Sequence, residues 1–209
     1  MKIQPIVEGY GEVDAVPVLL RRLRDEAGVF GVDVLRPIRQ KRSQLTQKST
    51  LQKAVQLAKL QPGCSAILII FDADNDCPKD LAPQLLEWAC DVASSIPCSV
   101  VMAVMEYEAW FLATIESLRG KSGIKIDANS VSGPESIRGA KEAIERNMEK
   151  GFAYMETTNQ PAFTAIFDMQ TAFKQCRSFR KMVMSFGDLI RDSGAQLSAW
   201  PPAQWIEEH

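Results

Sequence analysis

The chain has 209 residues, of which 46% are hydrophobic and 24% charged, and its formal net charge is −2. This length and composition are typical of a globular domain with a sizeable core, and they exclude a polycation that binds nucleic acid over its whole surface. The five cysteines form no CxxC pair, which argues against a disulfide framework or a structural zinc site. The only histidine is His209, the last residue, so a mechanism that needs a histidine base is close to excluded.

Neither a signal peptide nor a transmembrane helix is predicted, because no apolar run is long enough for either. Scattered free cysteines suit a reducing compartment. We therefore expect a cytoplasmic protein without a membrane partner.

The first half of the chain alternates between strand and helix patterns. In chain order the expected elements are a strand at 2–7, a loop at VEGYGE, a helix at 14–26, a strand within 29–38, a basic loop at 36–48 and a helix capped by Thr50. A buried strand at 66–71, a helix at 80–95, a strand at 99–105 and a helix at 110–118 follow. Pro5 favours an edge position or a strained start for the first strand.

The pattern changes after residue 118, where a loop at 120–134 precedes three helices expected at 135–150, 161–174 and 178–192. Strands that alternate with helices predict a mostly parallel sheet with right-handed crossovers. The predicted fold is therefore α/β and Rossmann-like, with a sheet flanked by helices over 1–118 and a C-terminal helical extension over 119–209 that packs on this core.

Acidic residues follow three of the expected strands, as Glu8 and Glu12, then Asp72, Asp74 and Asp76, then Glu106 and Glu108. The carboxyl ends of parallel strands line one crevice, so these acids are expected to meet, with Asp72 and Asp74 pointing to the same side. Two carboxylates about 5 Å apart repel by about 3 kcal/mol at an effective dielectric near 20. A shared proton or a cation relieves this repulsion, and oxygen ligands favour Mg²⁺ or Mn²⁺.

Two other interpretations of the acidic stretch DADND stay open. It could be a solvated turn that caps the next helix. The stretch IIFDADND also resembles the first motif of haloacid-dehalogenase phosphatases, in which Asp72 would be a nucleophile. That motif expects Thr or Val at the position of Asp76.

VEGYGE and DADND, each after an apolar strand, resemble the Toprim motif of a glutamate followed by DxD. The EGxGE form is similar to the Toprim domain of the overcoming-lysogenization-defect nucleases. Further stretches are similar to an uncharacterised bacterial Toprim-related family and span most of the chain: VEGYGEVDAVPVLLRRL, FDADNDCP, MEYEAWFLA, PESIRGAKEAI and FDMQTAFKQCRSFRKM.

The resemblance implies a Toprim fold and a Mg²⁺- or Mn²⁺-dependent nuclease, or the nuclease subunit of a DNA-processing or defence system. It implies catalytic roles for Glu8, Asp72 and Asp74, and a metal site that all seven acids could serve. The residues expected to guide nucleic acid are basic, namely Arg39, Lys41, Arg42, Arg180 and Lys181.

Three other interpretations are kept. The basic loop could be a solvated connection. Because many Toprim-like nucleases work beside an ATPase and this sequence has no ATPase motif, a separate ATPase partner is also expected. The whole chain could then be a non-catalytic regulatory module for that ATPase. The sequence does not choose between DNA and RNA, nor does it give an oligomeric state.

Overall fold

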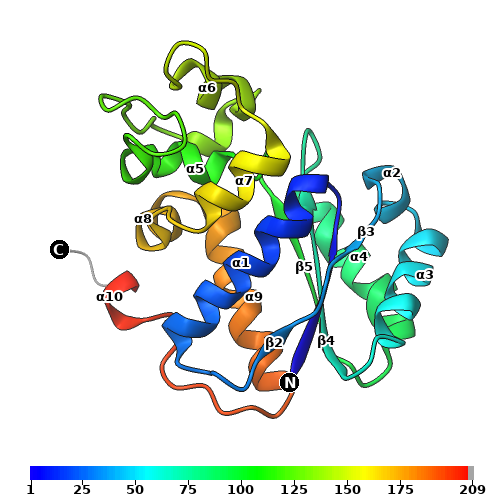
Figure 1. Cartoon of the computed structure of the whole chain (residues 1–209). Coiled ribbons are helices and arrows are strands. Elements are labelled where there is room, and N and C mark those ends of the chain that lie inside the picture. Colours follow the sequence, from blue (N-terminus) through cyan, green and yellow to red (C-terminus); the bar gives the residue numbers. More distant parts are fainter. Residues whose placement is uncertain (207–209) are drawn as a thin grey trace.

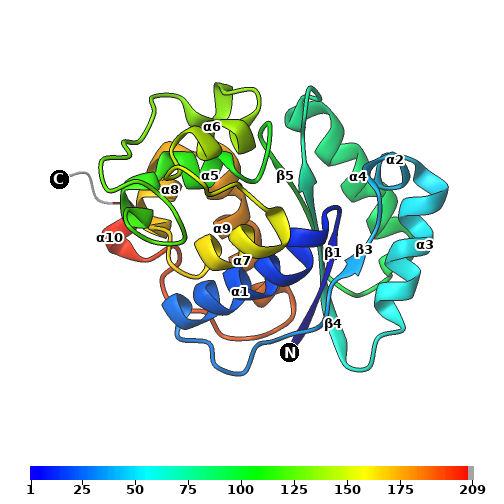
Figure 2. The same cartoon turned by 45° about the horizontal axis from the view of Figure 1, so that its top comes forward.

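A computed structural model describes residues 1–206, so His209 lies outside the described part of the chain. The predicted α/β fold is confirmed, because the structure has a mostly parallel sheet flanked by helices (Figures 1 and 2). The strand order is β2-β1-β4-β5, with β3 also paired to β1, and all of these pairings are parallel. The strands are β1 (Lys2–Val7), β2 (Asp33–Val34), β3 (Ile38–Arg39), β4 (Cys64–Asp72) and β5 (Cys98–Ala103).

Helices cover both faces of this sheet. They are α1 (Tyr10–Ala27), α2 (Arg42–Leu45), α3 (Lys48–Lys59), α4 (Pro78–Ala93), α5 (Ala109–Ala113), α6 (Ala140–Arg146), α7 (Glu156–Thr164), α8 (Met169–Gln175), α9 (Arg177–Asp192) and α10 (Ala203–Ile206). No helix within residues 1–206 is both long and apolar enough to cross a membrane.

The edge position expected for β1 was wrong, because β1 lies between β4 on one side and β2 and β3 on the other. Proline is tolerated there because the outer neighbour is interrupted between Val34 and Ile38, opposite Pro5. The side-chain amide of Gln4 donates a hydrogen bond of 2.8 Å to the carbonyl of Arg36 in this gap. One strand was expected within 29–38, and the structure has two short ones.

The loop expected at VEGYGE was also wrong, because α1 begins at Tyr10, four residues earlier than the expected start at Asp14. Gly9 is the N-cap, and its backbone N–H donates to the Glu12 side chain, which is the half of a capping box that a glycine N-cap allows. Glu12 therefore sits in the first turn of a helix, where its position is fixed by hydrogen bonds.

The basic segment 36–48 contains the short helix α2, and α3 already begins at Lys48. Thr50 does not cap α3, since its hydroxyl donates to the carbonyls of Gln44 and Gln47. Leu51, together with Ala54, Val55 and Ala58, nevertheless forms the expected buried face of this helix.

Two hydrophobic cores sandwich the sheet. The smaller core packs α3 and α4 on one face. The larger core packs α1 and α9 on the other face and continues without a break into the C-terminal helices. Aromatic rings fill it, and the Trp110 and Phe179 ring centroids lie 5.1 Å apart. Residues after 118 therefore complete this core, while the division at 118 itself stays a prediction.

The C-terminal helices are more broken than their apolar spacing indicated. The helix expected at 135–150 is limited to α6, because Gly139 takes a left-handed φ of 69° just before it. The helix expected at 161–174 is two helices, α7 and α8, and the one expected at 110–118 is α5 followed by a 3₁₀ turn at Ile115–Leu118. The last expected helix is found as α9.

Candidate functional site

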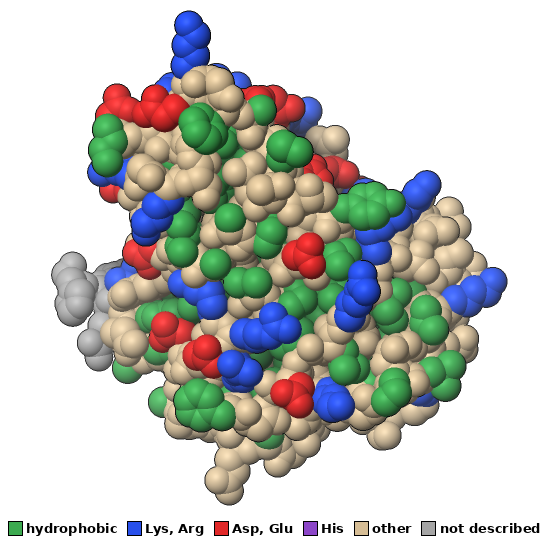
Figure 3. Space-filling model, viewed as in Figure 1, with side chains coloured by type: hydrophobic (Ala, Val, Ile, Leu, Met, Phe, Trp, Pro, Cys, Tyr) green, Lys and Arg blue, Asp and Glu red, His purple; other side chains and the backbone are tan. Residues whose placement is uncertain are grey.

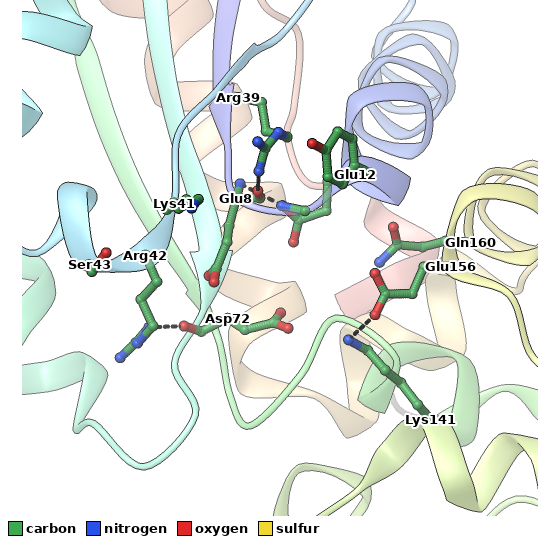
Figure 4. A pocket seen from close by; sticks show the side chains of 12 residues that line it. Glu8, Glu12, Arg39, Lys41, Arg42, Ser43, Asp72, Lys141, Glu156 and Gln160 are labelled. Atoms are coloured by element: carbon green, nitrogen blue, oxygen red, sulfur yellow. Dashed lines mark hydrogen bonds and ion pairs between the residues drawn. The ribbon is translucent and has the colours of Figure 1, made fainter.

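A cleft of about 430 Å³ opens at the carboxyl ends of β1 and β4 (Figure 4). Its walls come from the start of α1, from β3 and α2, and from α6 and α7. Twelve residues line it, namely Glu8, Gly9, Tyr10, Glu12, Arg39, Lys41, Arg42, Ser43, Asp72, Lys141, Glu156 and Gln160. The strand ends therefore form a single crevice, as expected for an open parallel sheet.

Glu8 and Glu12 meet at the junction of β1 and α1. The Glu12 carboxylate accepts hydrogen bonds from the backbone N–H of Glu8 at 2.8 Å and of Gly9 at 2.9 Å. Burial raises the pKa of Glu12 to about 7, despite those two hydrogen bonds. Burial also raises the pKa of Glu8, whose Oε2 is buried without a hydrogen-bond partner in the described structure.

Asp72, the last residue of β4, faces the same cleft. Its Oδ1 accepts a hydrogen bond of 2.8 Å from the backbone N–H of Tyr107, which fixes the side chain against the segment after β5. Burial raises the pKa of Asp72 well above its usual value, and the neighbouring carboxylates of Glu12 and Glu108 raise it further. Asp72 is thus electrostatically coupled to acids that follow two other strands.

Glu108 is fully buried beside the cleft. Its Oε1 accepts hydrogen bonds from the Tyr154 hydroxyl at 2.7 Å and from the Gln160 amide at 3.2 Å, while its Oε2 has no partner among the described residues. Burial raises the pKa of Glu108 to about 7. We call Glu8, Glu12, Asp72 and Glu108 the inner acids, because burial is the main cause of each raised pKa and because each carboxylate either raises the pKa of another or has its own pKa raised by one.

Lys141 is the cation on the α6 side of the cleft, and sequence reasoning gave it no role. Its ammonium pairs with Glu156 and its backbone N–H donates to the Glu106 carboxylate at 3.2 Å. Its charge also lowers the pKa values of Glu108 and Asp72. Glu156, Gln160 and Tyr154 were missed as well, because α7 meets the strand ends only in the folded chain. The only available signal was that Lys141 lies in the family-like stretch PESIRGAKEAI.

Gly11 is the second glycine of EGYGE, and the packing around it explains why this position has no side chain. A Cβ added there would lie 2.3 Å from Oε1 of Gln160 and 2.7 Å from the backbone carbonyl oxygen of Glu156. Any side chain at this position would therefore push α7 away from α1. The glycine allows the close approach that brings Gln160 to Glu108.

Asp74 and Asp76, which we call the outer acids, do not line the cleft, although the charge of Asp74 raises the pKa of Glu8. Asp74 has a left-handed φ of 49°, so the extended backbone expected between Asp72 and Asp74 is absent. Their carboxylates instead pair with Arg42, at 3.3 Å from its Nε for Asp74. Arg42 also donates to the carbonyls of Asp72 and Ala73, so it clamps the whole DADND loop.

The expected nucleic-acid residues separate into two groups. Arg39 and Lys41 line the cleft together with Arg42, and the Arg39 guanidinium lies 4.0 Å from the ring centroid of the exposed Tyr10. Figure 3 shows basic side chains over the region of β3 and α2. Arg180 and Lys181 lie on α9 and do not line the cleft. The Arg180 guanidinium donates to the carbonyl of Phe173 at 3.3 Å.

The carboxylates in and beside the cleft are candidate ligands for Mg²⁺ or Mn²⁺. Within residues 1–206, no three Asp, Glu, His or Cys side chains are arranged to hold a metal ion. Mg²⁺ often takes only one or two carboxylates and completes its coordination with water and substrate phosphate. Two residues could supply these carboxylates. One is Glu8, whose Oε2 has no hydrogen-bond partner among the described residues, and the other is Asp72 at the end of the neighbouring strand. The donor set therefore suits a hydrated divalent cation and not a closed protein cage.

Comparisons with known proteins give a family but no activity. No curated protein and no solved structure matches the chain. A family model described as "Domain of unknown function (DUF4276)" matches residues 7–186, from the last residue of β1 into α9. This match covers the cleft residues and most of the chain, and the protein therefore belongs to the DUF4276 family.

Proposed function

We propose that this protein is a Toprim-like, metal-dependent enzyme that processes phosphodiesters, and that it acts as a nuclease or as the nuclease subunit of a DNA-processing or defence system. The proposal rests on one observation, which is that two carboxylates and two basic side chains line the same cleft. Glu8 follows β1 and Asp72 ends the adjacent parallel strand β4, and Arg39 and Lys41 line the same cleft beside Glu8 (Figure 4). Acids suit a divalent cation, and the basic side chains suit a phosphate backbone.

Each group has a distinct task in this proposal. Glu8 and Asp72 would hold Mg²⁺ or Mn²⁺, which when bound supplies Lewis-acid activation of the phosphoryl group and of water. Arg39 and Lys41 would neutralise phosphate oxygens at the entrance. Tyr10, which is 66% exposed, offers an aromatic surface on which a base can stack. Glu12 would fix the backbone of Glu8 and Gly9, and Lys141 would link Glu106 to Glu156 at the same cleft.

The proposal is tested with purified protein, plasmid DNA and single-stranded RNA in the presence of Mg²⁺ or Mn²⁺. Asp72→Asn should lower the cleavage rate by about 100-fold or more, the scale of removing one group that acts in a transition state. Asp76→Asn is the matched control, because it changes the same charge on an outer acid and should stay near the wild-type rate. Equal rates for wild type and Asp72→Asn would contradict the proposal.

Hydrolysis of p-nitrophenyl phosphate distinguishes the phosphatase interpretation. A haloacid-dehalogenase-like enzyme would hydrolyse this substrate and would lose that activity in Asp72→Asn. A nuclease would leave it intact while cutting nucleic acid.

A second candidate is a non-catalytic module in the cytoplasm that serves a separate ATPase. The absence of three converging metal ligands within residues 1–206 favours it, as does the presence of Lys141 beside the inner acids. A lysine and shared protons can hold buried carboxylates together without a metal. Calorimetric titration with Mn²⁺ separates the two candidates, since binding that Glu8→Gln abolishes favours the enzyme and no binding favours the module.

A further inference from the structure

A second pocket lies away from the cleft, on the outer side of β5. It measures about 600 Å³ and lies between α4 and α9. β5 is the last strand of the sheet and pairs only with β4, so this side of the strand has no neighbouring strand. Figure 2 shows β5 with α4 on one side and α9 on the other. None of its lining residues belongs to the cleft.

The pocket is apolar in its interior. Val100, Met102 and Val104 come from β5 and from the residue that follows it, and Ala82 and Leu86 come from the facing side of α4. Val100 and Met102 also belong to the smaller hydrophobic core, which makes this floor part of the folded framework. A ligand that enters here would therefore bury apolar surface against fixed side chains.

The rim of the pocket is cationic. Lys79 at the start of α4 and Arg177 and Lys181 on α9 all line it, and all three side chains are exposed. Among the described residues these three form no ion pair and no acidic residue lines the pocket. Glu135 lies beside the first turn of α9, where its carboxylate accepts hydrogen bonds from the backbone N–H groups of Arg177 and Ser178.

The size of the pocket points to a small molecule. Its volume lies within the range of about 300–1,000 Å³ that is usual for small-molecule sites. Only twelve residues line it, whereas a standard protein interface uses about 20–30 residues on each side. We propose that this pocket binds an amphipathic anion, whose apolar chain or ring lies against β5 and α4 and whose acidic group meets the rim of Lys79, Arg177 and Lys181. This site is independent of the nuclease proposal.

The test uses 1-anilinonaphthalene-8-sulfonate, an apolar aromatic anion whose fluorescence rises when it is bound. The full chain should bind one equivalent, and decanoate should displace it. Decyltrimethylammonium has an apolar chain of the same length and a positive head group, and we expect it to displace the probe at least 10-fold less effectively.

Three variants locate the binding. Ala82→Trp fills the pocket and Lys181→Glu reverses a rim charge, and each should weaken probe binding at least 10-fold. Lys53→Glu reverses an exposed charge on α3 and should leave binding unchanged. Circular dichroism and thermal unfolding confirm that each variant is folded.

Two outcomes would overturn the proposal. Probe binding that is absent, or equal in all folded variants, would show that the pocket takes no anion. A change of oligomeric state in Ala82→Trp, measured by size-exclusion chromatography with light scattering and found without anion binding, would identify the pocket as a contact between copies of the chain.

Discussion

The inner acids and the outer acids all carry carboxylate groups, and Asp72 lies only a few residues before Asp74 and Asp76. The fold nevertheless places the two sets in different environments. Asp72 is partly buried at the end of β4, and this burial and the neighbouring carboxylates raise its pKa. Asp74 and Asp76 have side chains about half exposed, and both pair with Arg42. Glu12, Asp72 and Glu108 are thus crowded together, whereas the outer acids pair with Arg42, whose charge also lowers the pKa of Glu8.

This difference indicates which of the acids that follow the strands are available to bind a metal or to exchange a proton. A carboxylate that is paired with arginine gains little from a further cation, while crowded carboxylates are relieved by one. The charge of Lys141 lowers the pKa values of both Asp72 and Glu108. The inner acids are therefore the part of the motif that a metal, a proton or a substrate can influence.

The Arg42 clamp gives the largest expected effect. Arg42→Met removes the side chain that donates hydrogen bonds to two backbone carbonyls and forms ion pairs with both outer acids. We therefore expect the free energy of unfolding to fall by about 2–3 kcal/mol. Urea unfolding monitored by circular dichroism measures this. Arg24→Met, which breaks an exposed pair with Asp25, should cost no more than about 1 kcal/mol. Equal losses in both variants would show that the clamp has no special role.

The close approach of α1 and α7 gives the next effect. Gly11→Ala should lower the free energy of unfolding by about 1–3 kcal/mol, the usual cost of overpacking, because its Cβ would meet the backbone of Glu156. Gly31→Ala is the control, since an added Cβ there has no heavy atom within 4 Å. Thermal unfolding compares the two. A neutral Gly11→Ala would mean that α7 moves freely over the inner acids.

Glu108 makes stability depend on pH in a direction that can be tested without metal. Its pKa is near 7 in the folded chain and about 4.5 when unfolded, so between these values the folded state binds more protons. Its contribution to stability is therefore lost as pH rises from about 5 to 8.

Glu108→Gln keeps a hydrogen-bond acceptor for Tyr154 and carries no charge. Relative to wild type, this variant should gain on the order of 1 kcal/mol in the free energy of unfolding between pH 5 and pH 8. Urea unfolding in EDTA at both pH values measures the change. A difference between variant and wild type that is independent of pH would show that Glu108 is ionised throughout.

The smallest expected signal is proton release when a metal binds. Because the inner acids have raised pKa values, Mn²⁺ binding at pH 6.5 should release a fraction of a proton. Calorimetry in two buffers of different ionisation enthalpy detects this release. Asp76→Asn should leave it unchanged and Glu8→Gln should reduce it, and the reverse pattern would move the metal to the outer acids.

The sequence predicted the fold class well and the site in part. Unbroken apolar runs predicted β4 and β5, and the sequence pattern predicted helices at the positions of α1, α3 and α9. Acids after strands predicted that Glu8, Glu12 and Asp72 would meet, and they do line one cleft. The Toprim relationship, the metal and the substrate remain predictions.

What the sequence determined by itself is local: apolar periodicity, strand ends and the residue types that follow them. Only the tertiary structure decided that Asp74 and Asp76 turn to Arg42, that β1 is an inner strand despite Pro5, and that Lys141 and Gln160 join the site. The physical reason is that burial and pairing depend on neighbours distant in the chain. The pKa of a carboxylate, and hence its use, is set by those neighbours and not by its motif.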